Sequence, residues 1–255
     1  MTQDFYDALA PFYHLIYPNW SQSVARQAKA LQSLIEARWP TGRIQTIADV
    51  SCGIGTQTLG LAALGYQVWG TNLSPAEIER ARAEAKRRNL TIDFSVADMR
   101  KVAAHHDRQF DLVISCDNSV PHLLSDAEIL TAMRQFHALT APGGGCLISV
   151  RDYDNEVRQG TQVKPYGIRT EGDTRYLAFQ TWDFHGGDIY DVALYLVRDE
   201  GQPTCSTQVM RSKYYAVGLE TLRGLMLQAG FNQVEVLKDG FFQPVLIGLK
   251  ASEAA

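Results

Sequence analysis

Small and polar residues suited to holding a nucleotide-type ligand follow directly on an apolar run near position 50. The run ends at Asp49, and the turn Ser51-Cys52-Gly53-Ile54-Gly55 leads into a helix-forming segment. The two glycines allow the backbone to approach a ligand that any Cβ would block. A dinucleotide-binding turn needs a third glycine three residues after Gly55, and that position is Thr58. The turn alone does not decide the ligand, because such turns also occur as tight connections that bind none, so the segments downstream must decide it.

Further small or polar residues follow each of the later strands that the sequence predicts. They are Asn72, Asp98, Met99, Asp117, Asn118, Ser119 and Arg151. In an open parallel sheet, ligands lie beyond the carboxyl ends of the strands, where the strand order reverses. The pattern therefore predicts one site, built from several strand ends, at a single edge of the sheet.

The elements that must position these residues alternate between strand and helix. Strands are predicted over 44–50, 67–71, 91–96, 110–115 and 146–150. The segment Ser74-Pro75-Ala76-Glu77 has the N-cap, first-turn proline and nearby acid that begin a helix. This rhythm predicts an α/β fold, with a doubly wound and mostly parallel sheet covered on both faces.

After residue 151 the pattern changes to aromatic and β-branched runs over 175–184 and 188–198, which are joined by a hairpin-type turn, and residues 205–215 could form a third strand. We expect four regions: a helical cap over 1–42, a cofactor-binding core over 43–151, an antiparallel substrate insertion over 152–215, and a completion of the core over 216–255. The last strand should be antiparallel to the rest. Insertions over the mouth of a sheet are where substrate selection usually occurs.

Composition limits the class of partner. The 255 residues are 45% hydrophobic and carry a net charge of −4, which argues against nucleic acid or an anionic membrane as a partner. The sequence has no apolar run of membrane-spanning length and no positively charged start typical of a signal peptide. Its four cysteines are widely separated, which favours free thiols in a reducing cytoplasm and no metal site. A homo-oligomer remains open.

Five segments together resemble class I S-adenosylmethionine-dependent methyltransferases. In chain order they are DVSCGIG, GYQVWGTNLSPAEIERA, VADMR, FDLVISCDNSVPHL and APGGGCLI. The resemblance implies a Rossmann-like sheet, S-adenosyl-L-methionine as cofactor and S-adenosylhomocysteine as its product. It implies cofactor contacts from Tyr13, Ser51, Gly53, Gly55, Asn72, Leu73, Asp98, Met99 and Cys116.

One implied contact departs from the family pattern. Members usually carry Asp or Glu at the end of the second strand, where it accepts both ribose hydroxyls, whereas this chain has Asn72. Exchanging a charge-assisted hydrogen bond for a neutral one should weaken ribose binding by about 1 kcal/mol. Asp98 is expected to accept a hydrogen bond from the adenine amino group.

A narrower likeness is to the glycine and sarcosine N-methyltransferases. It is carried by four runs: 116–123, 151–154, 194–197 and 213–215. It implies that Asn118 and Arg151 hold the carboxylate of an amino acid. It also implies that Tyr17, Tyr195 and Tyr215 surround the transferring methyl group, with Tyr215 on the substrate side. The alternative is that Tyr195 and Tyr215 are ordinary aromatic residues of strands.

Asp117 departs from the narrower family, which has a glycine at that position. A carboxylate there could anchor an ammonium group or accept its proton, so we assign Asp117 to the catalytic group with Tyr17 and Tyr195. The sequence thus predicts methyl transfer to the nitrogen of a small amine that carries a carboxylate. Rival readings are an O- or C-methyltransferase of a small metabolite, an NAD(P)-dependent oxidoreductase, which Thr58 and Asn72 disfavour, and a non-catalytic S-adenosylmethionine-binding module.

Overall fold

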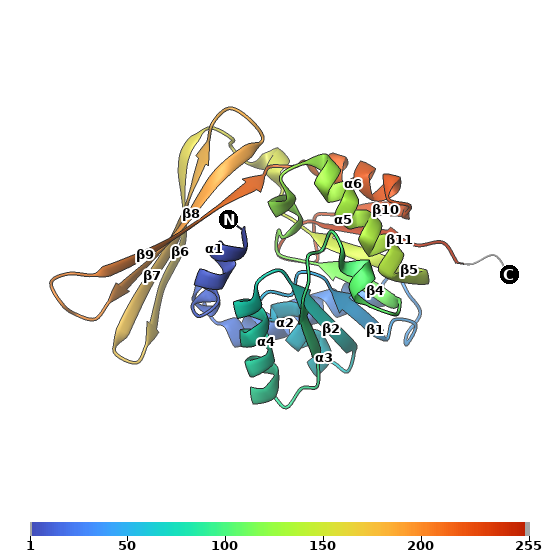
Figure 1. Ribbon diagram of the computed structural model, residues 1–255, viewed down its shortest axis with the longest axis horizontal. Coiled ribbons are helices and arrows are strands. Elements are labelled where there is room, and N and C mark those ends of the chain that lie inside the picture. Colours follow the sequence, from blue (N-terminus) through green and yellow to red (C-terminus); the bar gives the residue numbers. More distant parts are fainter. Residues whose placement is uncertain (1, 253–255) are drawn as a thin grey trace.

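The computed structural model describes residues 2–252, which form two separate β-sheets (Figure 1). The strands of the larger sheet are β1 (Thr46–Asp49), β2 (Gln67–Asn72), β3 (Asp93–Val96), β4 (Phe110–Ser115), β5 (Thr140–Ser149), β10 (Asn232–Leu237) and β11 (Val245–Leu249). Their order is β10-β11-β5-β4-β1-β2-β3. Strands β1 to β5 pair in parallel, and β11 is antiparallel to both of its neighbours. The predicted mostly parallel sheet with an antiparallel last strand is confirmed.

Helices cover both faces of this sheet. They are α2 (Trp20–Glu36), α3 (Thr56–Ala63), α4 (Pro75–Arg87), α5 (Asp126–Leu139) and α6 (Leu219–Gln228), whereas α1 (Thr2–Leu9) lies outside these two layers. Short 3-10 turns are η1 (Tyr13–Ile16), η2 (Val102–His105), η3 (Val120–Leu123) and η4 (Tyr153–Asn155). Successive residues of a strand point to opposite faces. Accordingly, Val113 packs in the core beneath α5 and α6, whereas Leu112 and Ile114 pack beneath α2.

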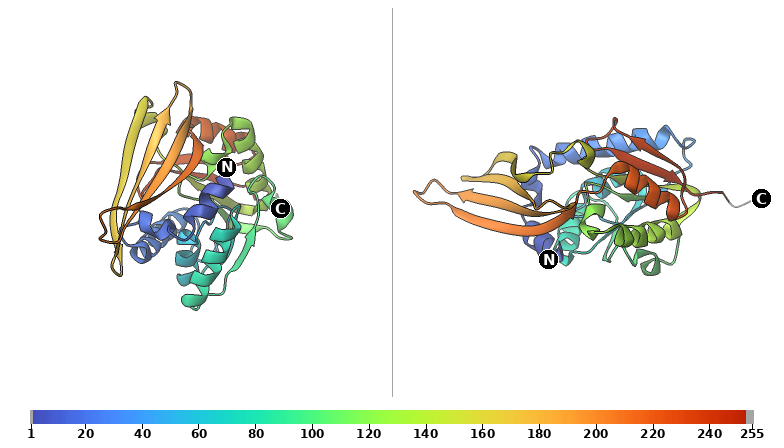
Figure 2. Two further views of the ribbon diagram at one scale, coloured as in Figure 1. Left: turned by 60° about the vertical axis from the view of Figure 1, so that its left-hand side comes forward. Right: turned by 90° about the horizontal axis from the view of Figure 1, so that it is seen from above.

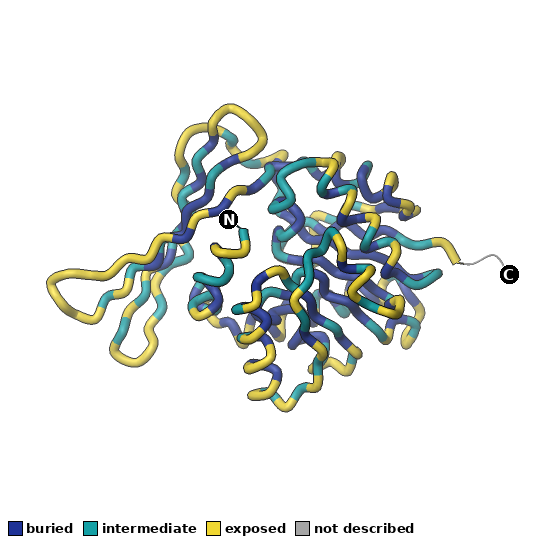
Figure 3. The backbone as a smooth tube through the Cα atoms, viewed as in Figure 1, coloured by how far each residue is buried: buried dark blue, intermediate teal, exposed yellow. Residues whose placement is uncertain are grey.

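The predicted antiparallel insertion is a four-stranded sheet in the order β6-β7-β8-β9. Its strands are β6 (Gly160–Glu171), β7 (Thr174–Phe184), β8 (Ile189–Asp199) and β9 (Ser206–Tyr215). The sequence predicted the last three and missed β6. Figure 2 shows this sheet standing beside the α/β core, and Figure 3 shows that its distal hairpins are exposed.

The N-terminal segment lies between the two sheets (Figure 1). Phe5, Leu9 and Leu15 are buried against Leu194 and Met210 of the smaller sheet. On the opposite side, the Asp7 carboxylate accepts a hydrogen bond from the backbone N–H of Ala76 at the start of α4. The segment therefore closes the space above the carboxyl ends of the parallel strands. No helix within the described range is both long and apolar enough to cross a membrane.

Candidate active site

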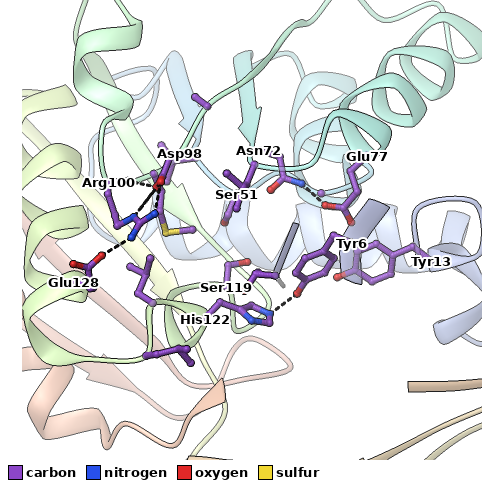
Figure 4. A pocket seen from close by; sticks show the side chains of 18 residues that line it. Tyr6, Tyr13, Ser51, Asn72, Glu77, Asp98, Arg100, Ser119, His122 and Glu128 are labelled. Atoms are coloured by element: carbon purple, nitrogen blue, oxygen red, sulfur yellow. Dashed lines mark hydrogen bonds and ion pairs between the residues drawn. The ribbon is translucent and has the colours of Figure 1, made fainter. Parts of the chain in front are cut away.

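A cavity of about 410 Å³ lies at the carboxyl ends of the central parallel strands, beneath α1 (Figure 4). Its lining includes seven of the residues predicted to hold a cofactor: Tyr13, Ser51, Gly53, Asn72, Leu73, Asp98 and Met99. Tyr6, Glu77, Arg100, Ser119, His122, Leu123 and Glu128 also line it. The strand ends thus bring together residues that are far apart in the sequence, as the sheet geometry requires.

Of the two glycines in the turn, Gly53 lines this cavity and Gly55 does not. Gly53 has φ +53°, and a Cβ there would lie 3.4 Å from the Tyr13 ring and 3.7 Å from Glu77 Oε1. Gly55 has φ +93°, but a Cβ there would meet Leu59 at 3.1 Å in the core. The structure therefore places Gly55 at the start of α3 and outside the lining of the cavity, and its expected cofactor contact stays a prediction.

The Asp49 side chain supports the turn through two hydrogen bonds. Its carboxylate accepts hydrogen bonds from the Ser51 N–H at 3.3 Å and from the Thr58 hydroxyl at 2.7 Å. Burial raises the pKa of Asp49 to about 7, although these two hydrogen bonds oppose the rise. The side chain is thus a structural support whose charge depends on pH.

This support predicts a pH dependence of stability. The unfolded carboxyl has a pKa near 3.8, so between about pH 4 and pH 7 the folded state holds the proton more tightly. The stabilisation that protonated Asp49 gives the folded state is fully present below about pH 4. It is lost as pH rises through 7, and the free energy of unfolding falls by up to about 1.4 kcal/mol per pH unit. The variant Asp49→Asn should therefore lose less unfolding free energy than wild type between pH 5 and 8 in urea denaturation. The exposed-loop variant Asp107→Asn serves as control, and equal slopes for Asp49→Asn and wild type would refute the assignment.

The end of β2 holds an amide and a carboxylate side by side. Asn72 donates a side-chain hydrogen bond to Glu77 Oε2, and Glu77 is fully buried. Burial raises the pKa of Glu77 to about 8. In the sequence, Glu77 is recognisable only as the acid of a helix start. Its backbone N–H does donate to the Ser74 hydroxyl at 3.1 Å, but its side chain lines the cavity. The only available signal was an acid five residues after the strand.

Asp98 lies at the opposite end of the cavity and already has a partner. Arg100 Nε approaches both of its carboxylate oxygens, at 3.0 and 3.1 Å, and a second Arg100 nitrogen also bonds Glu128 (Figure 4). Burial alone would raise the pKa of Asp98, but the hydrogen bonds from Arg100 lower it below its usual value. The Arg100 backbone N–H and Nη2 also donate to this carboxylate, so hydrogen bonds from Arg100 already occupy most of its roughly four acceptor positions.

Hydrogen bonds between uncharged groups connect α1, which covers the cavity, to η3 and β9. The Tyr6 hydroxyl lies 2.7 Å from His122 Nε2, and His122 Nδ1 lies 3.1 Å from the Lys213 carbonyl oxygen. Burial lowers the pKa of His122 to about 3, so the ring is neutral at physiological pH. The imidazole then donates from Nδ1 to the carbonyl and accepts from Tyr6.

Tyr13, which lines this cavity, stacks on Tyr17 with ring centroids 6.3 Å apart. Tyr17 in turn lines a second cavity.

The second cavity has a volume of about 380 Å³ and lies between the parallel sheet and the smaller sheet. Its lining is Ile16, Tyr17, Asp117, Arg151, Glu156, Lys164, Pro165, Tyr166, Trp182, Phe242 and Gln243. The Arg151 guanidinium lies 4.9 Å from the Trp182 ring centroid and 5.1 Å from that of Tyr214. Its Nη1 atom is buried and has no hydrogen-bond partner.

Asp117 faces Arg151 across this cavity. Its carboxylate accepts from the Tyr17 hydroxyl at 3.0 Å and from the Gln243 amide at 3.3 Å. Burial raises the pKa of Asp117, while Arg151 and the two hydrogen bonds moderate the rise. Its φ of +58° is uncommon for a residue with a side chain and tends to occur where the surrounding structure enforces it.

Asn118 supports the site without facing either cavity. Its amide nitrogen donates to the Tyr153 hydroxyl at 2.8 Å, and its amide oxygen accepts from the Arg151 N–H at 3.0 Å. The side chain is fully buried. In this structure Asn118 holds the Arg151 backbone in place, and its expected contact with the substrate stays a prediction.

The structure does not bring Tyr195 or Tyr215 to the site. Tyr195 stacks on Phe179, with centroids 4.8 Å apart, on the sheet face opposite the buried Leu194. The Tyr215 hydroxyl donates to Asp126 at 2.9 Å, and its neighbour Tyr214 is the buried residue beside Arg151. Because alternate residues face opposite sides of a strand, a one-residue shift decides which tyrosine points inward.

Cys116 also lies outside both cavities. It is buried in the core with Ile114 and Leu147, and burial raises the pKa of its thiol well above the usual value. Besides Glu77, the sequence missed Trp182, Tyr166, Tyr214 and Gln243. These four come from the smaller sheet or the C-terminal region, where no motif marked the direction of a side chain.

Sequence comparisons place the chain among methyltransferases. Residues 47–144 match the model of a family described as a methyltransferase domain. The chain is 25% identical over 164 residues to a glycine/sarcosine N-methyltransferase of Parasynechococcus marenigrum, an overlap of 60% of this chain and 58% of that protein. It is 32% identical over 105 residues to a ubiquinone biosynthesis O-methyltransferase of Psychrobacter cryohalolentis, an overlap of 40% and 39%. The chain thus spans about three-fifths or less of these relatives.

Solved structures show the same fold over most of both chains. An amino pentose methyltransferase of Micromonospora echinaspora, solved with S-adenosylmethionine bound, has a TM-score of 0.76 at 19% identity. The superposition covers 90% of this chain and 92% of that one. A sugar N-methyltransferase of a Streptoalloteichus species has a TM-score of 0.74 at 18% identity, with 91% and 90% covered.

Proposed function

The chain carries a class I S-adenosylmethionine-dependent methyltransferase domain, and from this premise we propose that it methylates the nitrogen of a small amine bearing a carboxylate. The cofactor would occupy the 410 Å³ cavity and the acceptor the 380 Å³ cavity beside it. Tyr13 and Tyr17 stack on each other, one lining each cavity. The transferring methyl group would pass between the two spaces near this pair.

The lining of the first cavity fits S-adenosylmethionine. Gly53 lines the cavity where the methionyl part would lie, and Leu123 with Met99 offers apolar walls. Asp98 would accept a hydrogen bond from the adenine amino group in exchange for one of those it now accepts from Arg100. S-Adenosylmethionine supplies a methyl group already activated by positive sulfur. Holding donor and acceptor in line is the main task left to the protein and can lower the barrier by roughly 7–11 kcal/mol.

Arg151 Nη1 is the single observation that carries the acceptor assignment. A buried guanidinium N–H without a partner costs free energy, and the natural compensation is a carboxylate held by two parallel hydrogen bonds. The rings of Trp182 and Tyr214 fix the guanidinium in place. We therefore infer that the acceptor brings the missing carboxylate.

Asp117 and Tyr17 would act on the amine end of the acceptor. Asp117 lies in the same cavity as Arg151 and carries an ionisable oxygen that can hold an ammonium group or take its proton. The Tyr17 hydroxyl donates to Asp117 and fixes its orientation. With the acid end on Arg151 and the nitrogen on Asp117, the amine lone pair would be directed toward the cofactor cavity.

O-Methylation of a small carboxylated metabolite is the second candidate. The 32% identity to ubiquinone biosynthesis O-methyltransferases favours it, although that match covers only 40% of this chain. Asp117 would then accept the proton of a hydroxyl instead of an amine. Arg151 would have the same role in both cases.

A labelled-methyl assay tests the proposal. The protein would be incubated with methyl-labelled S-adenosylmethionine and a panel of glycine, sarcosine, dimethylglycine, other amino acids, amino sugars and carboxylated phenols. We expect label on nitrogen in a carboxylate-bearing amine, located by mass spectrometry. Label on an amine that lacks a carboxylate would refute the role of Arg151. Label on oxygen would support the second candidate, and no transfer to any amine would refute the first.

A further inference from the structure

We propose that Glu77, clamped by Asn72, supplies the carboxylate that binds the ribose hydroxyls of the cofactor. The inference rests on the proposed function, since it names a contact of the same cofactor cavity. Asn72 then serves as a positioning residue, and the ligand-binding group comes from the first turn of α4.

The two oxygens of the Glu77 carboxylate have different surroundings. Oε2 accepts the hydrogen bond from the Asn72 side-chain nitrogen, whereas Oε1 is buried and has no hydrogen-bond partner. Oε1 lies 3.7 Å from the Cβ position of Gly53, at the open side of the glycine turn. Figure 4 shows Asn72 and Glu77 side by side at the edge of the cavity, with Ser51 next to them. A buried carboxylate oxygen without a donor indicates that the donor belongs to a ligand.

The position of this carboxylate selects the ribose as its partner. In nucleotide-binding sheets an acid at the end of the second strand accepts hydrogen bonds from ribose hydroxyls. Here that strand end carries Asn72, whose amide nitrogen is committed to Glu77. The Asn72 amide oxygen and Glu77 Oε1 thus offer one neutral and one charged acceptor, which matches a pair of vicinal hydroxyls. A carboxylate is therefore still present at the end of β2, but it belongs to Glu77 of the following helix, α4.

Several titratable groups face Glu77 and shape its response to pH. Asp7 and Tyr6 approach it from α1, Tyr13 from η1 and Cys52 from the glycine turn, and burial raises the pKa of Glu77 to about 8. The empty site therefore holds a proton on Glu77 at pH 7. Hydroxyls that donate to the carboxylate favour its charged form, so ligand binding should release that proton.

Calorimetric titration with S-adenosylhomocysteine tests the inference without requiring turnover. The variant Glu77→Gln keeps the size of the side chain and removes the charge. It should bind about tenfold to a hundredfold more weakly, as expected for losing a hydrogen bond to a charged group. Glu79→Gln, at an exposed position two residues along the same helix, should match wild type within about twofold. Titrations in two buffers at pH 7 should show proton release by wild type and none by Glu77→Gln.

Two further ligands decide which part of the cofactor Glu77 contacts. 5′-Methylthioadenosine keeps the ribose and lacks the amino-acid part, so Glu77→Gln should weaken it by the same factor. The 2′-deoxy analogue of S-adenosylhomocysteine should bind wild type weakly, and its affinity for Glu77→Gln should be little lower. The analogue already lacks the hydroxyl that Glu77 would contact, so removing the Glu77 charge has no further contact to disrupt. If methylthioadenosine bound both proteins equally, Glu77 would contact the ammonium group instead, and the inference would be wrong.

The outcomes separate this inference from the proposed function. If wild type does not bind S-adenosylhomocysteine, both fail. If wild type binds it and Glu77→Gln binds equally well, only the role of Glu77 fails. The comparison of the deoxy and intact ligands on wild type needs no variant, so equal affinity for the two would refute the ribose contact even if Glu77→Gln did not fold.

Discussion

Replacing Arg151 with methionine should lower kcat/KM for the acceptor by about 10²- to 10³-fold, because truncating a buried charged partner costs 2–5 kcal/mol. The loss should appear mainly in the acceptor KM, since Arg151 lies in the acceptor cavity and does not line the cofactor cavity. The affinity for S-adenosylhomocysteine should stay within about threefold of wild type. Initial-rate kinetics and calorimetry measure the two quantities separately.

Two further variants sharpen this prediction. Arg151→Lys keeps the charge but loses the planar fork that binds a carboxylate with two hydrogen bonds, so it should recover only part of the loss. Arg158→Met removes a nearby arginine that pairs with Asp188 outside the cavity, and its kinetics should resemble wild type. An equal weakening of acceptor and cofactor binding by Arg151→Met would remove Arg151 from the acceptor site.

Replacing Asp117 with asparagine should lower kcat/KM by about 10²-fold or more, the usual range for a group that positions or accepts a proton. Burial raises the pKa of Asp117, and its charged form is the one that holds the amine. The wild-type rate should therefore fall as pH drops through this raised pKa, and Asp117→Asn should lose that acidic limb. A pH profile of kcat/KM for both proteins measures the effect.

The variant Tyr17→Phe tests the titration of Asp117 without changing Asp117 itself. The Tyr17 hydroxyl donates to Asp117 at 3.0 Å and lowers its pKa. Its removal raises the pKa of Asp117 further, so the acidic limb should move to higher pH while the affinity for S-adenosylhomocysteine stays unchanged. An acidic limb that persists in Asp117→Asn would assign the titration to another group.

The parallel core was predictable because each of its signals is local. The turn at Gly53 and the polar residues that follow β2, β3 and β4 depend only on apolar runs and their ends. Parallel pairing then brings those ends to one edge of the sheet. The cofactor cavity follows from this rule, which is why Ser51, Asn72 and Asp98 meet there.

The acceptor cavity was harder to predict because its lining depends on strand direction and pairing. Tyr214 and Tyr215 are adjacent and chemically identical, and only the register of β9 against β8 turns Tyr214 inward. Tyr195 is excluded by the same alternation, because Leu194 takes the buried face. Sequence spacing alone could not decide either case, since nothing in residues 206–215 marks which face is covered.

Glu77 illustrates a different limit. Its spacing from Ser74 is that of a helix-capping acid, which is a complete local explanation for its presence. Only the folded arrangement shows that the carboxylate is buried beside the cavity, accepts a hydrogen bond from Asn72 on one oxygen and has no partner on the other. The substitution of Asn for an acid at the end of β2 was visible in the sequence, but the group that compensates for it was not.

Calorimetric titration of the wild-type protein with S-adenosylhomocysteine, alone and then with a carboxylate-bearing amine present, tests the two-cavity account most directly. The account predicts one site per chain for the thioether and a separate acceptor site that remains available when the thioether is bound. Absence of any heat of binding from S-adenosylhomocysteine would contradict the account, and so would direct competition between the thioether and an amine that the protein methylates.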